Sequence, residues 1–267
     1  MVIAEKGPES SPRVGVLERF PELQEIPDNK FPKNVFIIPD GNGRWAEAHG
    51  LHVSEGHKKG ADVIANAFED FHDLRRQIPY VGVWGLSVDN LKRSKEEVDF
   101  LMSLFNHAVQ DFEPKLIARD NRFMHIGRRD IYPNHPLWET IDRVEGKTRD
   151  NKGQTVYVAI GFSGKDQIVR ITQTLVEQAR FRAPFDVTEE MIDALRDGGG
   201  IIPEADLIIR SSGEHRLSGL GWLQGNGTEL HWDDTLFPDF TTENFVDGIV
   251  AFTQRDRRFG GRSKSKA

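Results

Sequence analysis

The residues best suited to chemistry lie in one short turn of the 267-residue chain, Asp40-Gly41-Asn42-Gly43-Arg44. An apolar run at residues 35–38 precedes it and predicts a buried strand that ends at Pro39. A helical pattern begins at Arg44. A strand, a glycine turn and a helix start predict an anion site, because free N–H groups and the helix dipole face outward there. Asp40 offers a carboxylate for Mg²⁺, and Arg44 offers a guanidinium for phosphate oxygens.

The same turn also fits a simpler interpretation. A surface turn followed by a helix is the commoner meaning of an Asp-Gly-x-Gly sequence, because such turns are frequent in proteins. The turn alone leaves both interpretations open, so the decision depends on the motifs that follow it.

The spacing of apolar residues predicts the elements that must position this turn. Strands are expected at residues 35–38, 80–86, 122–126, 155–162, 207–211 and 230–232, and helices at 60–77, 94–112, 136–150, 165–180, 188–195 and 242–258. This alternation predicts an α/β fold, a single domain with a central, mostly parallel six-stranded sheet flanked by helices. Ligands should bind beyond the carboxyl ends of the strands, where Asp40, Asn90 and Arg210 lie.

The chain is expected to have one domain with short extensions. Gly, Pro and Ser gather near the start, so residues 1–30 are predicted to be a mobile N-terminal arm with a short helix around residues 16–25. A lid and a plain tail are both open for this arm, and a tail is favoured. The domain would span residues 31–262, and residues 263–267 would form a disordered tail.

Composition excludes several classes of protein. Hydrophobic residues are 37% and charged residues 29% of the chain, as in globular proteins. The net charge of −7 argues against nucleic-acid binding. The chain has no cysteine, which excludes disulfides and thiolate metal sites and fits a cytoplasmic protein. No apolar run is long enough to span a membrane and no signal-peptide pattern is present, so we expect at most peripheral membrane contact.

Several motifs in order resemble the cis-prenyltransferases, the undecaprenyl diphosphate synthase family. They are PDGNGRWA with a later GH, SVDNLKRSKEEVDFLM at 87–102, DLIIRSSGEHRLS at 206–218, TELHW at 228–232, LFPDF at 236–240 and RDRRFGG at 255–261. An ordered series is far more specific than any one motif. The resemblance implies the family's fold, a homodimer, and an enzyme that joins two isoprenoid diphosphates with Mg²⁺ as cofactor.

Prenyl transfer sets clear requirements for such a site. The allylic substrate loses diphosphate and leaves a carbocation-like carbon, which the double bond of the second substrate attacks. The site therefore needs cations for two diphosphates, a metal for the leaving group, and a dry apolar wall around the hydrocarbon.

The resemblance implies a role for each matching residue. The metal would be held by Asp40 and Glu229, and the catalytic residues would be Asp40, Asn42, which would assist proton loss, and Asn90. The allylic diphosphate would be bound by Gly41, Asn42, Gly43, Arg44, His57 and Arg93. The second diphosphate would be bound by Arg210, Arg216, Ser218, Arg258 and Gly260, the last two from a terminal segment that closes the site across the dimer interface. The hydrocarbon pocket would be formed by Val81, Val83, Trp84, Phe100 and Leu104, with Ile160.

These assignments have structural alternatives. A lone histidine such as His57 is usually solvent-facing, Glu229 fits a surface charge at a strand end, and the terminal arginines fit a basic tail. The apolar residues fit an ordinary core equally well, because periodicity cannot separate a tunnel from a core.

The chain departs from the ordinary chain-elongating members near both substrates. Pro39 replaces a methionine, Val53 an arginine, Asp89 a glutamate and Leu91 a tryptophan, and residues 161–165 and 219–224 also differ. The diphosphate and metal ligands remain, so the sequence predicts a working but altered enzyme. Pro39, together with a serine after Arg93, resembles the lavandulyl-type branch, which couples two allylic diphosphates head-to-middle.

The prediction is therefore a short branched product, made from dimethylallyl diphosphate with itself or with geranyl diphosphate. Regular cis elongation with isopentenyl diphosphate is the first alternative. A non-catalytic subunit of a partner prenyltransferase is the second, and the intact Asp40, Asn42 and Arg44 argue against it. A terpene-type enzyme that ionises one diphosphate is the third, and the retained Arg210 and Arg216 argue against that.

Overall fold

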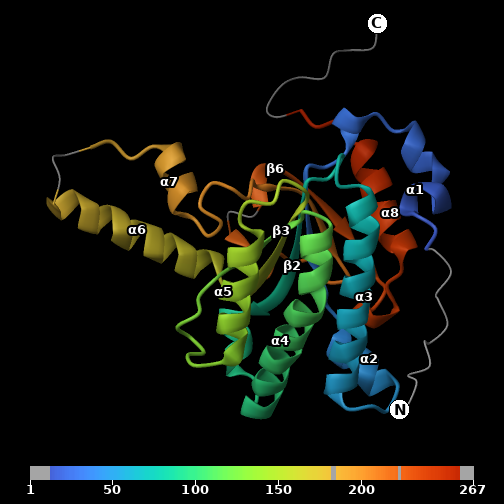
Figure 1. Cartoon of the computed structure of the whole chain (residues 1–267), viewed down its shortest axis with the longest axis horizontal. Coiled ribbons are helices and arrows are strands. Elements are labelled where there is room, and N and C mark those ends of the chain that lie inside the picture. The colour runs from blue at the N-terminus through green and yellow to red at the C-terminus, as the bar shows by residue number, and fades with distance from the viewer. Residues whose placement is uncertain (1–12, 182–184, 222–223, 259–267) are drawn as a thin grey trace, which may run out of the picture.

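Six strands form one parallel sheet in the order β3-β4-β2-β1-β5-β6 (Figure 1). The computed structural model describes residues 13–181, 185–221 and 224–258 of the chain. The predicted α/β fold, with a six-stranded sheet flanked by helices, is confirmed, and every strand pairing is parallel. The strands are β1 (Asn34–Ile38), β2 (Tyr80–Ser87), β3 (Arg122–Ile126), β4 (Thr155–Phe162), β5 (Ala205–Arg210) and β6 (Gln224–Trp232).

The helices begin where local chemistry favours a cap. Ser94 accepts a hydrogen bond from the N–H of Glu97 at 3.2 Å, and Thr188 accepts one from Met191 at 3.3 Å. No described helix is long and apolar enough to cross a bilayer. The helices are α1 (Val16–Arg19), α2 (Asn42–Ala48), α3 (Val53–Asp73), α4 (Lys95–Ala118), α5 (Pro136–Thr148), α6 (Gly164–Phe181), α7 (Glu189–Leu195) and α8 (Thr242–Thr253).

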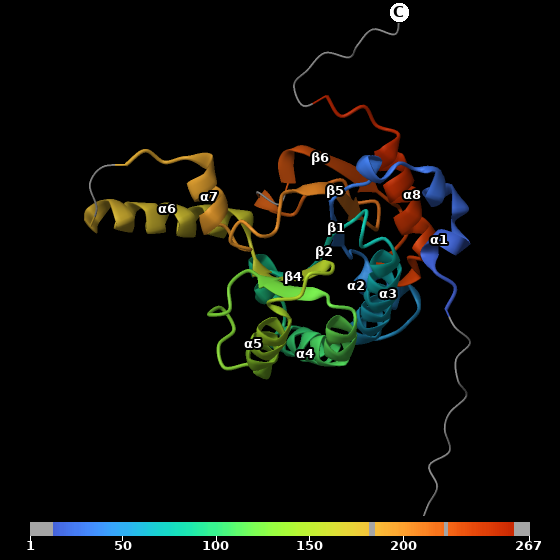
Figure 2. The same cartoon turned by 45° about the horizontal axis from the view of Figure 1, so that its top comes forward.

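Helices α3, α4, α5 and α8 cover one face of the sheet, as Figure 2 shows for α4 and α5. The main core lies between them and alternate strand residues such as Val35 and Ile37, because successive side chains of a strand point to opposite faces. On the other face, Phe36 and Tyr157 stack with ring centroids 5.7 Å apart in a second, smaller core. The sheet is thus buried on both faces near its centre.

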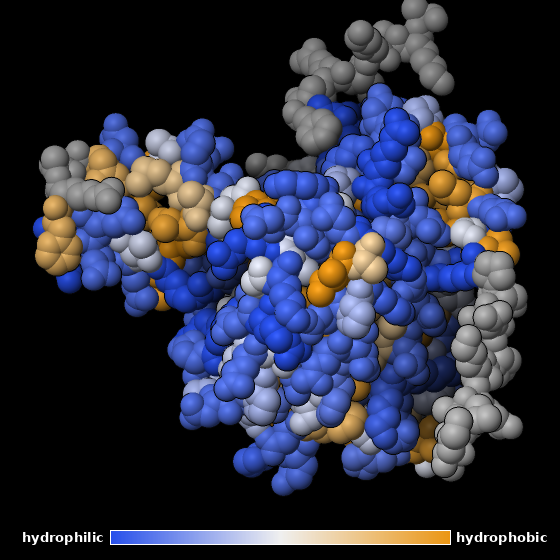
Figure 3. Space-filling view, in the orientation of Figure 1, coloured by the Kyte–Doolittle hydropathy of each residue, from blue (hydrophilic) through white to orange (hydrophobic). Residues whose placement is uncertain are grey.

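Helix α6 departs from this compact arrangement and extends away from the sheet together with α7 (Figures 1 and 2). Only Gly164, Gln167 and Ile171 of α6 are buried. Figure 3 shows apolar residues on this projecting arm, where Val176 is 51% and Phe181 82% exposed. An exposed apolar helix face of this kind is typical of an interaction surface.

The N-terminal segment differs from the predicted mobile arm at residues 1–30. Residues 13–30 pack on α3, with Val16 and Leu23 each only 1% exposed in the main core. Arg13 and Arg19 both pair with Asp70, a buried carboxylate of α3. The predicted short helix is present as α1 followed by a 3₁₀ turn, η1 (Pro21–Glu25). Residues 1–12, the end of the predicted domain beyond 258 and the tail at 263–267 lie outside the described residues.

Candidate active site

The site lies in the middle of the sheet, where the strand order reverses between β1 and β5. Ile38 of β1 is the register partner of Arg210, so the chain that leaves β1 meets the end of β5. Arg210 Nη2 donates a hydrogen bond to Asp40 Oδ2 at 2.8 Å. Two predicted ligands separated by 170 residues in sequence are therefore in direct contact.

The turn after β1 requires glycine at its first bend. Gly41 has φ of 101°, a left-handed conformation, and a Cβ there would lie 2.8 Å from the Leu236 side chain. Its N–H donates to Asp40 Oδ1 at 2.7 Å, which fixes the carboxylate. Helix α2 then starts at Asn42 and presents Arg44, whose Nη2 lies 3.4 Å from Asp40 Oδ1.

Asp40 is held as a carboxylate. Burial raises its pKa, but the hydrogen bond and charge of Arg210 lower it, with help from the Gly41 N–H and Arg44. The net result is a pKa below the ordinary aspartate value of 3.8. Asp40 is thus ionised at neutral pH, as a metal ligand must be.

The loop after β5 gathers the remaining predicted ligands of the second diphosphate. Arg210 Nη1 donates to Ser218 Oγ at 2.8 Å and also to the Arg216 carbonyl oxygen. Arg216 Nη2 lies 4.0 Å from Asp40 Oδ2. The Arg210 side chain is only 3% exposed; both of its Nη atoms have protein partners, whereas its buried Nε has no hydrogen-bond partner among the described residues.

His57 and Arg93 lie together on the other side of the turn. Arg93 Nη1 lies 2.9 Å from Glu97 Oε1, and His57 Nε2 lies 3.6 Å from the same oxygen. Burial lowers the pKa of His57, Glu97 raises it and Arg93 lowers it, with a net result below 6.5. His57 is therefore neutral at neutral pH in the free protein.

Asn42 and Asn90 both border the cavity but are held differently. The Asn42 amide donates to the Pro39 carbonyl at 2.9 Å, and its buried Oδ1 has no hydrogen-bond partner among the described residues. The Asn90 Oδ1 accepts from the Ser87 N–H at 2.9 Å in a capping box, so that oxygen is committed to the turn. The amide N–H groups of Asn90 are the part able to meet a ligand.

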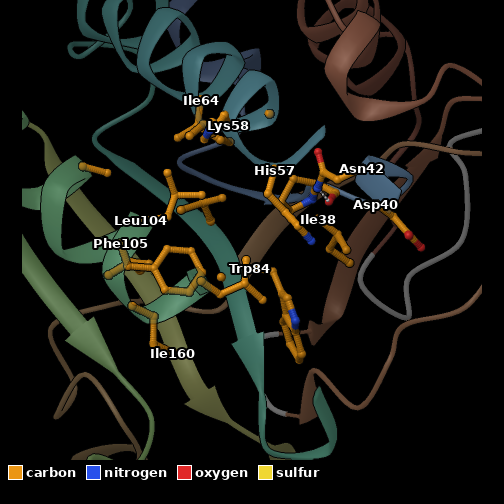
Figure 4. Close-up of a pocket in the computed structure, with 18 of the residues that line it drawn as sticks. Ile38, Asp40, Asn42, His57, Lys58, Ile64, Trp84, Leu104, Phe105 and Ile160 are labelled. Atoms are coloured by element: carbon orange, nitrogen blue, oxygen red, sulfur yellow. Dashed lines mark hydrogen bonds between the residues drawn. The ribbon is translucent and has the colours of Figure 1, made fainter. Parts of the chain in front are cut away.

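A cavity of about 910 Å³ opens at Asp40 and continues between the sheet and helices α3 and α4 (Figure 4). All predicted allylic-site ligands line it, together with Arg210, Arg216 and Ser218. Figure 4 shows Asn42, His57 and Asp40 at one end and Leu104, Phe105 and Ile160 at the other. The arrangement joins an anion-binding mouth to an apolar interior.

The residues predicted to form the hydrocarbon wall are divided in the structure. Val83, Leu104 and Ile160 line the cavity, whereas Val81 and Phe100 do not. Trp84 borders the cavity, but its ring makes edge contacts with Phe36 and Phe162 of the second core. The residues that the prediction missed lie further along α3 and α4, namely Ile64, Ala65, Phe68, Leu101, Phe105, Ala108, Val109 and Phe112.

Comparison with known proteins identifies the family. A family model described as "Putative undecaprenyl diphosphate synthase" matches residues 38–260. The chain belongs to the undecaprenyl diphosphate synthase family. It is a prenyltransferase enzyme, similar to the isoprenyl transferase of Geobacillus kaustophilus (34% identical, covering 89% of this chain and 92% of the relative) and that of Thermotoga maritima (36% identical, covering 87% and 98%).

Solved structures agree with this assignment. The lavandulyl diphosphate synthase of Lavandula x intermedia, solved with dimethylallyl diphosphate, has a TM-score of 0.80 at 30% identity and covers 87% of this chain and 99% of its own. A probable undecaprenyl diphosphate synthase from Campylobacter jejuni has a TM-score of 0.69 at 24% identity, covering 86% and 98%, which supports the fold alone.

The other residues predicted for the metal and for the second diphosphate lie away from this cavity or outside the described residues. Glu229 is the register partner of Leu207, well before the carboxyl end of β6, and its Oε2 lies 2.5 Å from Arg255 Nη1. Glu229 does not line the cavity that holds Asp40. Arg258 is exposed and lies 3.3 Å from Asp256, and Gly260 is outside the described residues. The predicted roles of these three residues remain predictions.

The donor set still fits Mg²⁺. The described residues contain no group of three or more His, Cys, Asp or Glu side chains that would hold a metal on their own. Mg²⁺ is commonly bound by one or two carboxylates together with substrate phosphates and water. The ionised Asp40 at an arginine-lined mouth offers that kind of site.

One departure from the family pattern, the glycine at position 221, is explained by packing. Gly164, which opens α6, and Gly221, in the loop after Ser218, face each other. A Cβ on Gly164 would lie 2.4 Å from the Gly221 Cα, and the Gly164 N–H donates to the Gly219 carbonyl at 2.9 Å. A Cβ on Gly221 would likewise lie 2.5 Å from the Gly164 Cα, so the close approach of these two segments requires glycine at position 221.

Proposed function

We propose that this prenyltransferase couples an allylic diphosphate, held near Asp40 and Arg44, to a second five-carbon diphosphate held by Arg210, Arg216 and Ser218. The observation that carries the proposal is the mouth of the cavity. The ionised carboxylate of Asp40 lies at this mouth, at the entrance to an apolar interior. Three guanidinium groups lie within 4.0 Å of that carboxylate. Fixed charges at the mouth of a dry cavity suit the departure of a diphosphate from an apolar chain.

Each residue at the mouth of the cavity has its own proposed role. Asp40 would hold Mg²⁺, which when bound supplies positive charge to the leaving diphosphate. Arg44 offers its fork to the allylic diphosphate, and Arg210 with Arg216 offers theirs to the second one. Asn42, which lines the mouth of the cavity, would assist proton loss from the second substrate.

Regular chain elongation with isopentenyl diphosphate is the coupling that the cavity supports best. The lining residues of α4 from Leu101 to Phe112 extend over about 16 Å of helix. The eight main-chain carbons of a geranyl group, with bonds of about 1.5 Å, extend at most about 10 Å. The cavity is thus deeper than a short branched product requires. We therefore place regular elongation first, although the sequence alone favoured the branched product.

Head-to-middle coupling remains the second candidate, because a specific likeness favours it. The lavandulyl diphosphate synthase superposes well on this chain, and Pro39 and Val53, two of the departures from the elongating enzymes, both line the cavity. If it holds, dimethylallyl diphosphate would serve as both substrates, or as partner to geranyl diphosphate, and the product would be short and branched.

We also propose a homodimer in the cytoplasm. The exposed apolar residues of α6 would be covered by a second copy, and the segment at 257–261 would reach the neighbouring site. The cytoplasmic location is supported by the absence of cysteine from the sequence. A catalytically silent subunit is opposed by the intact contact between Asp40 and Arg210.

One incubation tests these proposals. Pure protein is supplied with Mg²⁺ and dimethylallyl, geranyl or farnesyl diphosphate, each with and without isopentenyl diphosphate, and products are identified by mass and NMR. A linear product that requires isopentenyl diphosphate supports elongation, and a branched product made without it supports head-to-middle coupling. Asp40→Asn protein prepared in parallel excludes a contaminating enzyme. If no product forms under any of these conditions, the coupling proposal is wrong.

A further inference from the structure

The loop after β5 carries a carboxylate, Glu214, for which the sequence predicted no role. Its Oε1 lies 3.3 Å from Arg44 Nη1, and its other oxygen accepts a hydrogen bond from Arg216 Nη1. The side chain is 29% exposed, so it is largely covered. Arg44 belongs to the predicted allylic site and Arg216 to the predicted second site, so one carboxylate bridges both.

The backbone around Glu214 is bent into a conformation that aims it at these arginines. Ser212 has φ of 75°, a left-handed conformation that costs a non-glycine residue free energy. The bend is held from the next loop, because the Ser212 N–H donates to the Thr235 carbonyl and the Gly213 N–H to the Asp233 carbonyl, both at 2.8 Å. Backbone strain that the surroundings maintain in this way is concentrated at functional sites.

The two ends of this loop are tied to arginines of the site. Ser212 Oγ accepts a hydrogen bond from Arg44 Nη2 at 2.6 Å, and Ser218 Oγ accepts one from Arg210 Nη1 at 2.8 Å. Ser218 is also left-handed, with φ of 49°. Glu214 therefore sits on a loop whose bend, ends and side chain are all fixed against the site.

Glu214 differs from a single surface ion pair in its geometry, with partners Arg44 and Arg216 that are 47% and 59% exposed. Exposed pairs hold two flexible side chains loosely and contribute little. Here one carboxylate contacts two guanidinium groups whose other edges lie 3.4 and 4.0 Å from Asp40. A guanidinium is a rigid fork with five N–H donors, so fixing one edge sets the direction of the rest.

We propose that Glu214 is a positioning residue shared by the two diphosphate sites. It orients Arg44 and Arg216 before substrates arrive, which reduces the ordering cost of binding at both sites. The inference rests on the proposed function for the identity of the two ligands. It predicts that a substitution of Glu214 weakens the binding of both substrates. A substitution of Ser212 or Ser218 should weaken the binding of only one of them.

The test compares four variants by steady-state kinetics with each substrate varied in turn. Glu214→Ala should raise the KM of both substrates about tenfold, with a smaller change in kcat, since hydrogen bonds to charged groups are of that strength. Glu214→Gln, which keeps one acceptor oxygen, should have a smaller effect on both. Ser212→Ala should raise mainly the allylic KM, and Ser218→Ala mainly the KM of the second substrate.

A binding measurement separates this inference from the proposed reaction. Calorimetric titration with inorganic pyrophosphate needs no turnover, so it reports on Glu214 even if the incubation yields no product. Weaker pyrophosphate binding by Glu214→Ala and Glu214→Gln, with melting temperatures near wild type, supports the inference. It is overturned if both variants bind pyrophosphate and both substrates as wild type does, if only one substrate is affected, or if only the melting temperature falls.

Discussion

The two halves of the active site are built in different ways. The allylic half comes from α2, α3 and the start of α4, and each of its predicted ligands, from Gly41 to Arg93, lines one cavity within a single chain. The second half comes from the loop after β5 and the C-terminal segment, and only Arg210, Arg216 and Ser218 of its predicted ligands line that cavity. All residues predicted for the allylic half thus line the cavity, whereas of those predicted for the second half Arg258 does not line it and Gly260 is outside the described residues.

The halves also differ in the kind of charge they use. The allylic half contains a histidine, His57, whose pKa lies below 6.5 in the free protein, and two arginines, Arg44 and Arg93. The described ligands of the second half are two arginines and a serine, which do not change charge near neutral pH. Two sites for the same diphosphate group should therefore respond differently to truncation and to pH.

The largest effect is expected at Asp40, where the halves meet. Asp40→Asn should lower kcat about a thousandfold, because it removes the charge that holds Mg²⁺ against the leaving diphosphate. Glu96→Gln, an exposed carboxylate on the first turn of α4, is the matched control and should keep wild-type kcat. Near-normal turnover of Asp40→Asn in Mg²⁺ would contradict the assignment.

The structure changes the stability that is expected of variants at Asp40. From sequence, a turn residue such as Asp40 should be dispensable for stability. In the structure it is the partner of the buried Arg210, and removing one member of a buried pair is destabilising. Asparagine keeps an acceptor for Arg210, so its melting temperature should lie closer to wild type than that of Asp40→Ala.

A smaller effect is expected from shortening the C-terminus. Truncation of the chain after Arg257 should raise the KM of the second substrate about tenfold, which is the effect of losing one charged hydrogen bond. The KM of the allylic substrate should stay nearly unchanged. Arg257 must be kept, because it pairs with Asp206 at 2.8 Å and donates to the Gly227 carbonyl at 2.9 Å. Light scattering should show a dimer, and a fully active monomer would contradict the shared site.

The depth of the cavity provides a third test. Ala108, which is exposed and lines the cavity, can be replaced by Trp to narrow it; Ala108→Trp should shorten the longest product, while the KM values of both diphosphates change less than about threefold. Ala118→Trp, at the exposed end of α4 and away from the cavity, is the control. If the wild-type product is short and Ala108→Trp leaves it unchanged, the depth of the cavity has no role and head-to-middle coupling gains support.

Local patterns predicted the scaffold well. The bounds of β3 and β4 agree with the predicted ranges, because apolar alternation between turn residues determines them. Helix α4 runs beyond its predicted end at residue 112 in spite of Pro114, since Leu116 is fully buried and packing outweighs the local preference. Residues 13–30 were underestimated for the same reason, as Val16 and Leu23 reach the core.

The site was predicted where motifs supply both residue and position. Asp40 and Arg210 could be paired because both follow strands whose ends must meet at one edge of the sheet. Sequence patterns did not single out Leu101 and Phe105 as cavity-lining residues, because they have the same helical spacing as core residues. Glu214 was missed because its position depends on left-handed backbone at Ser212, which sequence patterns do not reveal.

The smallest predicted effect concerns pH and His57. Burial lowers the pKa of this histidine below 6.5, so it is neutral in the free protein above that value. A diphosphate beside it favours the protonated form, so binding raises the pKa and takes up a proton. The allylic KM should therefore fall by up to about tenfold as pH decreases from 8 to 6, since a shift of one pKa unit is a tenfold change.

The second substrate is the internal control for this prediction. Both substrates carry the same diphosphate, whose own ionisation near pH 6 affects both in parallel, and only the allylic one lies beside His57. The ratio of the two KM values should thus change with pH in the wild type and stay constant in His57→Asn. Calorimetry in buffers of different ionisation enthalpy should show proton uptake for the allylic ligand alone. If the ratio of the two KM values does not change with pH in the wild type, His57 stays neutral in the complex. The two halves of the site would then not differ in their response to pH.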